Sequence, residues 1–345
     1  MRLTFSVASP ENIDFIPSSI ATPLLEHVDM KLLALANILL PSSVLKLPDI
    51  FCLRACLISF LSFKRIRKYI RIDDKRQAKG CELKMHSYPS DITRKQYDMI
   101  REDLESAKKI TKPRQKDLFD IFCAILYLLK SGCQWRMIPL DYPNFQTVYY
   151  YYSIWSSIRE DGNTILSKVL NKLVTMHRND DLRKDKTTFG IIDAQSIQNA
   201  DTAEEKGYDA GKKVSGIKRH AVVDTMGLPH ALLVTTANVT DRDGAIKMIG
   251  LNLDNLSSVK TYLVDGGYSG EKFANAVKEV CGAEVEVAKR NELHKFEVLP
   301  KRWVVERSFG WVDKARRLWK NCERKIQNSL QMLILAFIAI LIKRV

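Results

Sequence analysis

The sequence lacks the cysteine pattern that marks a zinc-binding or disulfide-rich protein. Its 345 residues include seven cysteines, an odd number, and these are scattered without a C-x2-C pair. A zinc ribbon needs such pairs, so a structural zinc site of that kind is excluded. The N-terminus also lacks a charged segment followed by a clean apolar run and a small-residue cleavage site. We therefore expect a reduced, cytoplasmic protein, associated with the nucleoid if it binds DNA.

Long hydrophobic runs are also missing. The longest, LILAFIAILI at residues 333–342, is followed directly by Lys343 and Arg344. A membrane-spanning helix needs about 20 apolar residues, so we predict a buried C-terminal helix and no membrane partner. A second apolar stretch at residues 50–63 is interrupted by Arg54 and precedes a basic segment. An interfacial amphipathic segment is the minor alternative for that stretch.

Acidic residues are too few to balance the basic ones. The chain has 54 lysines and arginines against 40 aspartates and glutamates, which gives a formal net charge of +14. Nucleic acid is the commonest polyanion that such a chain meets in a cell. Charge alone does not decide between DNA, ribosomes and a merely solvated surface.

The chain divides into three parts by its patterning. Residues 1–84 show no steady period and are predicted to be a divergent N-terminal extension or a segment upstream of the true start. Residues 85–180 predict a helical, helix-turn-helix-like DNA-binding domain, although any small bundle fits the pattern almost as well. Its four expected helices cover residues 91–104 behind an Asp91 cap, 115–132, 145–161 and 164–178.

Residues 186–345 change to the period of two that is typical of strands. The strands are expected at residues 188–193, 218–224, 229–236, 261–265 and 284–288, with helices at 244–249, at 271–280 and after Pro300. An antiparallel meander that continues into parallel strands with covering helices predicts an α/β fold. Its catalytic domain would be ribonuclease H-like, with a mixed five-stranded sheet.

Three acids carry the candidate chemistry of this part. Asp193 and Asp265 are each expected to end an apolar strand, and Glu306 lies on the later helix. The first and fourth strands lie side by side in such a sheet, so the two aspartates converge at its rim. Carboxylates are the oxygen ligands that Mg²⁺ prefers, and two ions about 3.5–4 Å apart suit phosphoryl transfer. Singly, each acid is better read as a turn residue or a solvated side chain; together they favour a metal site.

Several long motifs carry a resemblance to a known family. They are IIDAQSIQ, EEKGYDAGKKVSGIKRHAVVDTMG, TANVTDRDGA, LVDGGYSG and LPKRWVVERSFGWVDKARRLWKNCE, with CQWRMIPLDYPNFQTVYYYYSIW in the helical part. The region from Ser90 to Val345 resembles the IS5-group insertion-sequence transposases of the IS4-type DDE superfamily.

That resemblance implies a function and its machinery. Asp193, Asp265 and Glu306 become the catalytic and metal-binding triad, with Mg²⁺ as cofactor and Mn²⁺ as a substitute. The expected partners are the terminal inverted repeats of the element and target DNA, bound by a homodimer, with no small-molecule substrate. The reaction would be cut-and-paste transposition.

The chain departs from the family pattern at a few positions. Leu299 stands where the superfamily signature has a tyrosine, and Asp313 where it has a lysine, with Lys314 adjacent as a substitute. Ala194 replaces the serine that usually follows the first aspartate. No long insertion separates Asp265 from Glu306.

Basic residues near the triad are expected to contact DNA phosphates, which supply affinity and salt dependence more than sequence choice. The candidates are Lys212, Lys213, Lys218, Arg219 and His220 on a loop entering the second strand, and Arg302, Arg307, Arg316 and Arg317 on the final helices. Of the remaining acids, Asp224 is predicted to be a turn residue and Asp241 a helix cap, with a minor alternative that either assists the metal.

Two other functions stay open at this point. A catalytically silent DNA-binding protein derived from a transposase would act as a repressor or scaffold, but an intact triad argues against it. A hydrolytic nuclease on the same fold would cut DNA without joining it.

Overall fold

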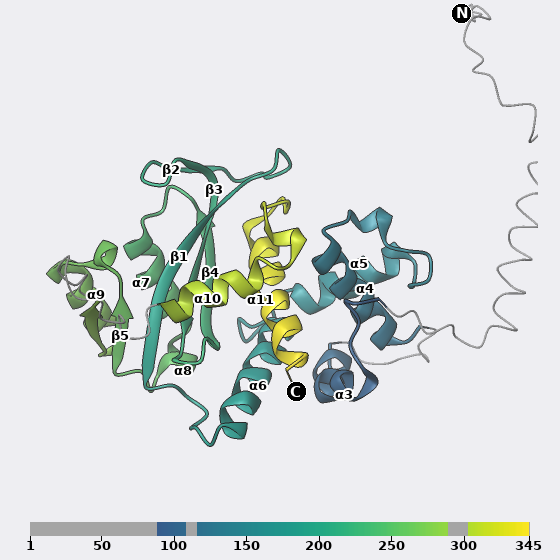
Figure 1. Ribbon diagram of the computed structural model, residues 1–345, viewed down its shortest axis with the longest axis horizontal. Helices are drawn as coiled ribbons and strands as arrows, with labels where there is room; N and C mark the ends of the chain where they lie inside the picture. Colours follow the sequence, from purple (N-terminus) through teal and green to yellow (C-terminus); the bar gives the residue numbers. More distant parts are fainter. Residues whose placement is uncertain (1–87, 108–115, 289–302, 345) are drawn as a thin grey trace, which may run out of the picture. The chain divides into compact units, whose positions relative to one another are not determined.

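A mixed β-sheet organises the C-terminal part of the chain. The computed structural model describes residues 88–107, 116–288 and 303–344, which belong to one compact unit within Lys84–Val345 (Figure 1). The strands are β1 (Phe189–Gln198), β2 (Gly207–Asp209), β3 (Val214–Val223), β4 (Pro229–Thr236), β5 (Thr261–Val264) and β6 (Glu284–Val287). The predicted extension, residues 1–84, lies outside the described residues.

The sheet has the predicted order, with one short strand added. Strands β3 and β1 pair antiparallel, β1 and β5 parallel, and β5 and β6 parallel, while β4 pairs antiparallel with β3. The added strand β2 pairs with the first residues of β3, beyond the end of β4. The predicted α/β class is confirmed, and the sheet has six strands where five were expected.

Two predicted strand boundaries are wrong for one reason. The first strand was expected to end at Asp193, but β1 continues to Gln198, and β3 begins at Val214 and not at Lys218. These added residues pair with each other, Gln198 opposite Gly216 and Ser196 opposite Lys218. Backbone groups that pair in a long hairpin-like ladder satisfy their hydrogen bonds although the side chains are polar, so hydropathy alone did not show them.

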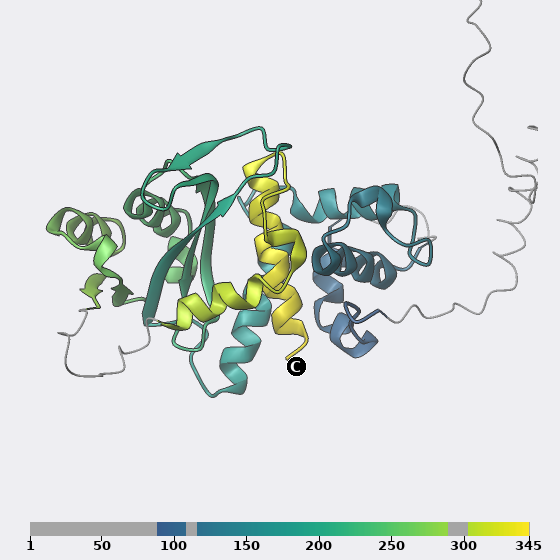
Figure 2. The same ribbon diagram turned by 45° about the horizontal axis from the view of Figure 1, so that its top comes forward.

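Each face of the sheet packs against a different set of helices. Side chains alternate along a strand, so Ile191 and Leu263 point to one face and Ile192 and Tyr262 to the other. The first face is covered by α10 (Trp303–Val312), α11 (Ile326–Ile342) and α6 (Ile165–Asp180). The second is covered by α7 (Asp241–Leu251), α8 (Leu253–Leu256) and α9 (Glu271–Cys281), and Figure 2 shows the sheet between the two groups.

Tight contact at the sheet centre explains the glycine in FGIID. A Cβ built on Gly190 would lie 2.8 Å from the Tyr262 ring and 2.9 Å from a methyl group of Val222. Any larger side chain would push neighbouring strands apart or displace buried groups. Gly190 therefore allows β1 to lie closely beside β5, where the candidate acids follow.

The helical part contains the four predicted helices, with two corrections. They are α3 (Arg94–Glu105), α4 (Leu118–Ser131), α5 (Phe145–Ser156) and α6. The cap of α3 is Thr93, in a capping box with Gln96, and not Asp91, whose carboxylate accepts hydrogen bonds from the Tyr88 N–H and the Tyr142 hydroxyl. Helix α5 ends at Ser156 and not at residues 161–162, because Ser157 already has extended backbone.

The C-terminal apolar run forms a buried helix, as predicted. Nearly every residue of α11 after Ser329 is buried, and the helix packs against α6, α4 and β4. Among the residues that the structure describes, no helix is both long enough and apolar enough to cross a bilayer. Helix α11 thereby joins the helical part to the sheet, and it holds α10 against the face where the candidate acids lie.

Candidate active site

The register of the two parallel strands places two of the candidate acids side by side. Ile191 of β1 pairs with Leu263 of β5, and Asp193 and Asp265 each follow two positions later. Equal steps along neighbouring parallel strands keep residues adjacent. Asp193 lies within β1 and Asp265 directly after β5. The prediction that the strands carrying these two acids lie side by side is therefore confirmed for the backbone.

The third acid reaches this region from the helix that covers the same face. Asp193 shares its face of β1 with Ile191, which packs in the cluster that includes Val305 and Phe309 of α10. Those residues hold α10 against β1 and β3. Glu306 follows Val305 and is exposed beside this contact. The helix buries Val304, Val305 and Phe309 and leaves the glutamate at the rim.

The electrostatics of Asp193 show that the charges of the other two acids reach it. Burial is the largest cause that raises the pKa of the Asp193 carboxyl, to about 6. The negative charges of Asp265 and Glu306 both raise this pKa further. The N–H of Ala194 and the ammonium of Lys212 act in the opposite direction. Three acids therefore crowd negative charge at one rim, which is the condition that a bound cation relieves.

The carboxylates are held by nearby backbone donors. The N–H of Ala194 donates to Asp193 Oδ1 at 2.7 Å, and the N–H of Gly267 donates to Asp265 Oδ1 at 2.9 Å. Within the described ranges, no three histidine, cysteine or acidic side chains are close enough to hold a metal ion as they stand. The donor set nevertheless fits a hard divalent cation, because three carboxylates supply only oxygen ligands.

A lysine lies next to the first acid. Lys212 lies in the turn between β2 and β3, where Asp209 Oδ1 accepts hydrogen bonds from the N–H groups of Gly211 and Lys212. Its Nζ donates to the carbonyl of Ala194 at 3.0 Å and lies 3.6 Å from Asp241 Oδ2. The Lys212 side chain is largely exposed, so the ammonium stands at the rim beside Asp193 with donors to spare.

Comparison with known proteins agrees with this geometry. The family described as "Transposase DDE domain" matches residues 184–342, which contain all three acids. A second family, described as "Putative transposase of IS4/5 family", matches residues 92–159 in the helical part. The chain belongs to the IS4/5-type DDE transposases. Domains of this family have a ribonuclease H-like fold and depend on divalent metal.

A curated relative supports the same family. The chain is 34% identical over 117 residues to "Putative transposase for insertion sequence element IS402" from Burkholderia cepacia. The aligned region is 32% of this chain and 55% of the relative, so the chain spans about half the length of the relative it matches.

Three residues expected to face DNA are buried in this IS4/5-type chain. Lys218, Arg219 and His220 lie inside β3 and not on a loop, with exposed fractions of 5%, 1% and 0%. The Lys218 ammonium lies 3.2 Å from Asp209 and 2.9 Å from Asp241. These partners and the burial remove all three side chains from a DNA-facing surface, and the prediction is wrong for them. The basic run in the sequence showed that these residues are charged, but not whether their side chains point to solvent or into the protein.

Two of the three buried groups form ordinary packing contacts. Arg219 donates to the carbonyl of Leu318 at 2.7 Å. The His220 ring bonds Thr235 Oγ1 at 3.0 Å and fills the space beside Gly244, where a Cβ would lie 2.1 Å from the ring. Burial lowers the pKa of His220 to about 4, so the ring is neutral at physiological pH.

The arginines of the C-terminal helices have different environments. Arg317 is buried and pairs with Glu323 at 2.7 Å, so its predicted DNA contact is also wrong. Arg316 is exposed, and its guanidinium lies 5.6 Å from the centre of the Trp319 ring. Arg307 is half-buried, and Arg302 lies outside the described residues. Exposure thus keeps Lys212, Lys213 and Arg316 as the clearest of the predicted phosphate contacts.

The other predicted acids have structural roles. Asp224 is a buried turn residue, as predicted: it pairs with Arg178 and accepts hydrogen bonds from the N–H groups of Met226 and Leu228. Asp241 is the first residue of α7, but the cap is Thr240, whose hydroxyl accepts from the Asp243 N–H. The prediction of Asp241 as cap is therefore wrong by one residue.

A polar contact between the strand and α10 was missed by the sequence reasoning. Gln195, two residues after Asp193 on the same face, donates to Asp313 Oδ2 at 2.8 Å. Arg219 lies 3.6 Å from the other oxygen of Asp313. Asp313 occupies the place of the family's lysine, and here it ties the end of α10 to β1. Asp193 and Gln195 are two residues apart, so their side chains point to the same face of a strand. This spacing was the sequence signal that could have indicated the contact.

Proposed function

We propose that this chain binds the terminal inverted repeats of an insertion sequence, cleaves phosphodiester bonds at the element ends, and transfers the resulting 3′ hydroxyl ends into target DNA. The observation that supports this most is the convergence of Asp193 and Asp265 at one sheet rim. Glu306 is close enough to raise the pKa of Asp193. The match of residues 184–342 to the transposase DDE domain supports the reaction class.

The triad would hold Mg²⁺, with Mn²⁺ as a substitute. Asp193 and Asp265 would supply oxygens from the sheet and Glu306 an oxygen from α10. When bound, divalent metal activates the attacking water or hydroxyl and stabilises the leaving oxygen. The protein holds the two aspartates in fixed register and buries part of Asp193, which strengthens its attraction for a cation.

Lys212 is the residue placed to steady a phosphate beside the triad. Its ammonium is held over the Ala194 carbonyl, one residue from Asp193, while its side chain stays largely exposed. A phosphate arriving at the rim would meet this charge before it meets the acids, which lowers the repulsion between DNA and the three carboxylates. Lys213 and Arg316 would add contacts to the backbone on either side.

The partner would be DNA, bound by two copies of the chain. A transposition event joins two element ends, so one active site for each end requires a homodimer on DNA. The helical part, residues 92–159, would contribute recognition of the terminal repeats. No covalent protein intermediate is needed, because water and then the 3′ hydroxyl act as nucleophiles.

The proposed triad is tested by incubating the full chain with DNA that carries the terminal repeats and with Mg²⁺. Asp193→Asn keeps the shape and the hydrogen bond from Ala194 but removes a metal ligand. We expect cleavage to fall by about 10²–10³-fold, the usual scale for losing one charge-stabilising group. The matched control is Asp254→Asn, an exposed acid on α8 across the sheet, which should keep wild-type cleavage.

The products separate the competing functions. Joined products from the wild type support strand transfer, whereas nicks without joining would indicate a nuclease. Tight repeat binding with no cleavage by any variant would indicate a silent repressor or scaffold. Cleavage that survives Asp193→Asn would overturn the triad.

A further inference from the structure

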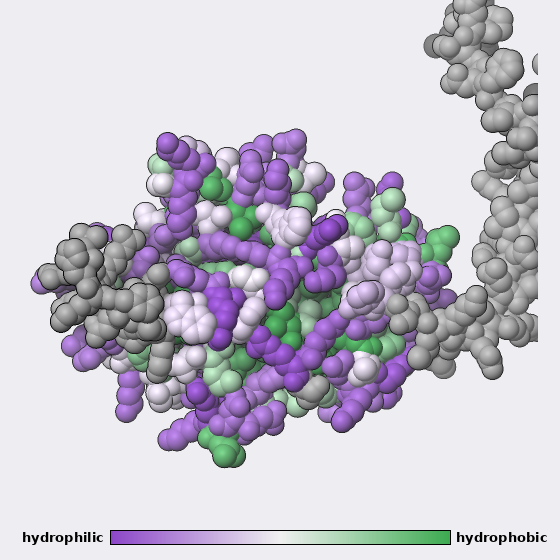
Figure 3. Space-filling model, in the orientation of Figure 1, coloured by the Kyte–Doolittle hydropathy of each residue, from purple (hydrophilic) through white to green (hydrophobic). Residues whose placement is uncertain are grey.

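Basic side chains gather where α4, α10 and α11 meet, around a cavity of about 460 Å³. Its floor is apolar, formed by residues that include Leu126, Leu129, Ala336 and Ile340. Its lining also carries Lys130, Lys314, Lys343 and Arg344, and it includes no acidic residue among the described ones. These four cations, together with Arg307 and the indole of Trp311, are called the Trp311 cluster below. Figure 3 shows hydrophilic side chains over the stretch of surface where α10 and α11 lie.

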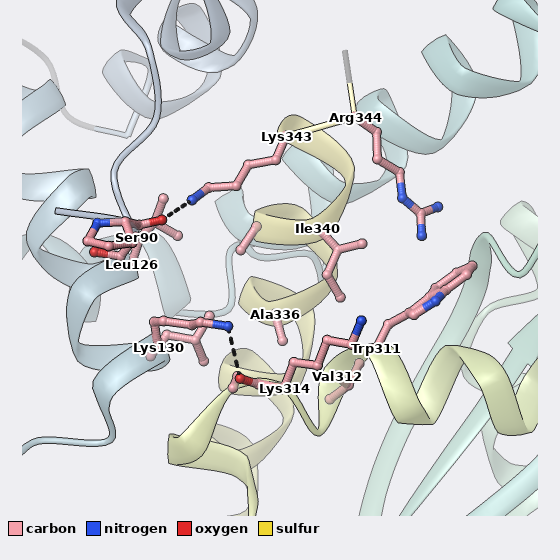
Figure 4. Close-up of a pocket in the computed structure, with 14 residues that line it drawn as sticks. Ser90, Leu126, Lys130, Trp311, Val312, Lys314, Ala336, Ile340, Lys343 and Arg344 are labelled. Carbon is pink, nitrogen blue, oxygen red and sulfur yellow. Dashed lines mark hydrogen bonds between the residues drawn. The ribbon is translucent and has the colours of Figure 1, made fainter. Parts of the chain in front are cut away.

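Two arginines share the ring at the centre of the Trp311 cluster. The guanidinium carbons of Arg307 and Arg344 lie 4.7 Å and 4.0 Å from the centre of the Trp311 ring. Figure 4 shows the Arg344 side chain directed toward this indole. A cation–π contact is attractive, but it leaves the charge of the arginine in place. The two like charges therefore remain close together.

The two arginines of the cluster differ in their surroundings. Burial lowers the pKa of the Arg344 guanidinium, and the charge of Arg307 lowers it further. Arg307 Nη2 donates to the Met226 carbonyl at 3.1 Å, while its buried Nε has no acceptor in the described part of the chain. A bound anion would relieve the repulsion between the two adjacent cations.

Contacts within the described part of the chain leave these charges largely uncompensated. Lys130 Nζ donates to the Lys314 carbonyl at 3.2 Å, and Lys343 Nζ donates to the Pro89 carbonyl at 2.9 Å (Figure 4). Both acceptors are neutral, so each ammonium keeps its full charge and two further N–H donors. The negative charge of Asp91, whose carboxylate also accepts the hydrogen bonds of Tyr88 and Tyr142, offsets part of the Lys343 charge. The cluster therefore carries a net positive charge, which favours binding of an anionic group.

We propose that the Trp311 cluster is a second DNA-backbone contact surface, separate from the triad and from the lysines beside it. This inference rests on the proposed function, because it takes DNA as the partner. Glu306 and Trp311 lie five residues apart on α10, about 7.5 Å along the helix axis. Five residues also turn the helix by about 140°, so the cluster and Glu306 lie on different sides of α10. A duplex held at the triad would therefore reach the cluster with phosphates several nucleotides from the cleaved bond, which recur about every 3.4 Å along each strand. The cluster would bind the phosphates that flank the cleaved bond.

The experiment measures how DNA affinity depends on salt, with the full-length chain and a short random-sequence duplex. Each phosphate contact contributes about 0.9 to the slope of log K against log salt concentration. The Lys343→Gln/Arg344→Gln variant removes two contacts and should lower the slope by about 1.8. The matched control is Lys247→Gln/Lys278→Gln, which removes the same charge from exposed positions of α7 and α9 on the opposite face of the sheet.

The outcomes distinguish this inference from the proposed function. A salt slope that falls in the Lys343→Gln/Arg344→Gln variant but not in the control variant supports the Trp311 cluster. Arg344→Lys, which keeps the positive charge, should retain the wild-type slope at that position. An unchanged slope, or an equal loss in the control variant, overturns it while DNA binding by the wild type still stands. Absence of duplex binding by the wild type would overturn the Trp311 cluster as a DNA-backbone surface, while the triad is judged separately by cleavage of DNA that carries the terminal repeats. Far-ultraviolet circular dichroism and melting temperature confirm that each variant is folded, and Arg344→Gln alone replaces the double variant if Lys343→Gln destabilises the contact to Pro89.

Discussion

At the scale of single residues, two acids of the same domain are shifted in opposite directions. Burial raises the pKa of Asp193 to about 6. Asp224 is also buried, which raises its pKa, but hydrogen bonds and the charge of His230 outweigh burial and lower it below 3.8. The difference lies in their partners, since Asp224 pairs with Arg178 and accepts two backbone N–H groups. The partners of Asp224 within the fold stabilise its ionised form, whereas the surroundings of Asp193 disfavour its ionised form.

These shifts predict opposite effects of pH on stability. The folded pKa of Asp193 exceeds its ordinary value of 3.8, so its favourable contribution exists below pH 3.8 and is lost as pH rises through about 6. Asp224 contributes above pH 3.8 and loses that contribution as pH falls through its lowered pKa. Without metal at pH 7.5, ionised Asp193 therefore destabilises the protein by at most about 3 kcal/mol.

We predict that Asp193→Asn makes the metal-free protein more stable. Urea denaturation in chelator at pH 7.5 should show a free energy of unfolding higher by about 1–3 kcal/mol, with no gain at pH 4. The exposed control Asp254→Asn should change neither value. A gain that is the same at both pH values would show that charge burial at Asp193 is not the cause.

At the scale of elements, the turn between β3 and β4 sets the position of α10. Gly227 in this turn has φ of 87°, and its carbonyl accepts the Ser308 hydroxyl at 3.1 Å. A Cβ at Gly227 would lie 2.6 Å from Ser308 Oγ and 3.1 Å from the Trp311 ring. The turn is thus packed directly under the helix that carries Glu306.

We predict that Gly227→Ala lowers both stability and cleavage by moving α10 away from the sheet. The left-handed backbone costs about 1–2 kcal/mol for alanine, and the close contact adds about 1–3 kcal/mol. The control is Gly162→Ala, because Gly162 has φ of 75° but no atom within 4 Å of its Cβ position. It should lose only the backbone part of the stability and keep cleavage. Chemical denaturation and the cleavage assay measure both effects, and equal losses in the two variants would contradict this account of α10.

At the scale of the whole molecule, periodicity predicted more of the fold than of the surface. Alternation in TFGIID, PHALLVTT and TYLVD predicted the central strands, and the spacing of apolar residues predicted the helices. The predictions failed where polar backbone pairing extends a strand, as in β1 and β3, because hydropathy does not report hydrogen bonds between distant segments. They failed again for the side chains of Lys218 and Arg219, which are buried. The sequence does not show where a charged side chain points or which residue it pairs with. Both depend on elements that are distant along the chain.

A metal bound at the triad would join parts of the molecule that are distant in sequence. Asp193 and Asp265 belong to the sheet, and Glu306 belongs to α10, which packs against α11 and so against the helical part. A ligand that binds only the folded state raises the free energy of unfolding, by about 2.7 kcal/mol at 100 times its Kd. We therefore expect Mn²⁺ or Mg²⁺ to raise the melting temperature of the wild type. Glu306→Gln, which keeps the size of the side chain, should lose most of this rise.

The control for this measurement is Glu271→Gln, an exposed acid at the start of α9, which should keep the full rise. Calcium, which accepts more ligands and looser geometry, should stabilise the fold without supporting cleavage if the triad alone holds the ion. An equal rise in Glu306→Gln and in the wild type would mean that α10 does not contribute a ligand. The metal site would then rest on Asp193 and Asp265 at the sheet rim, and Glu306 would act on the reaction without holding the cation.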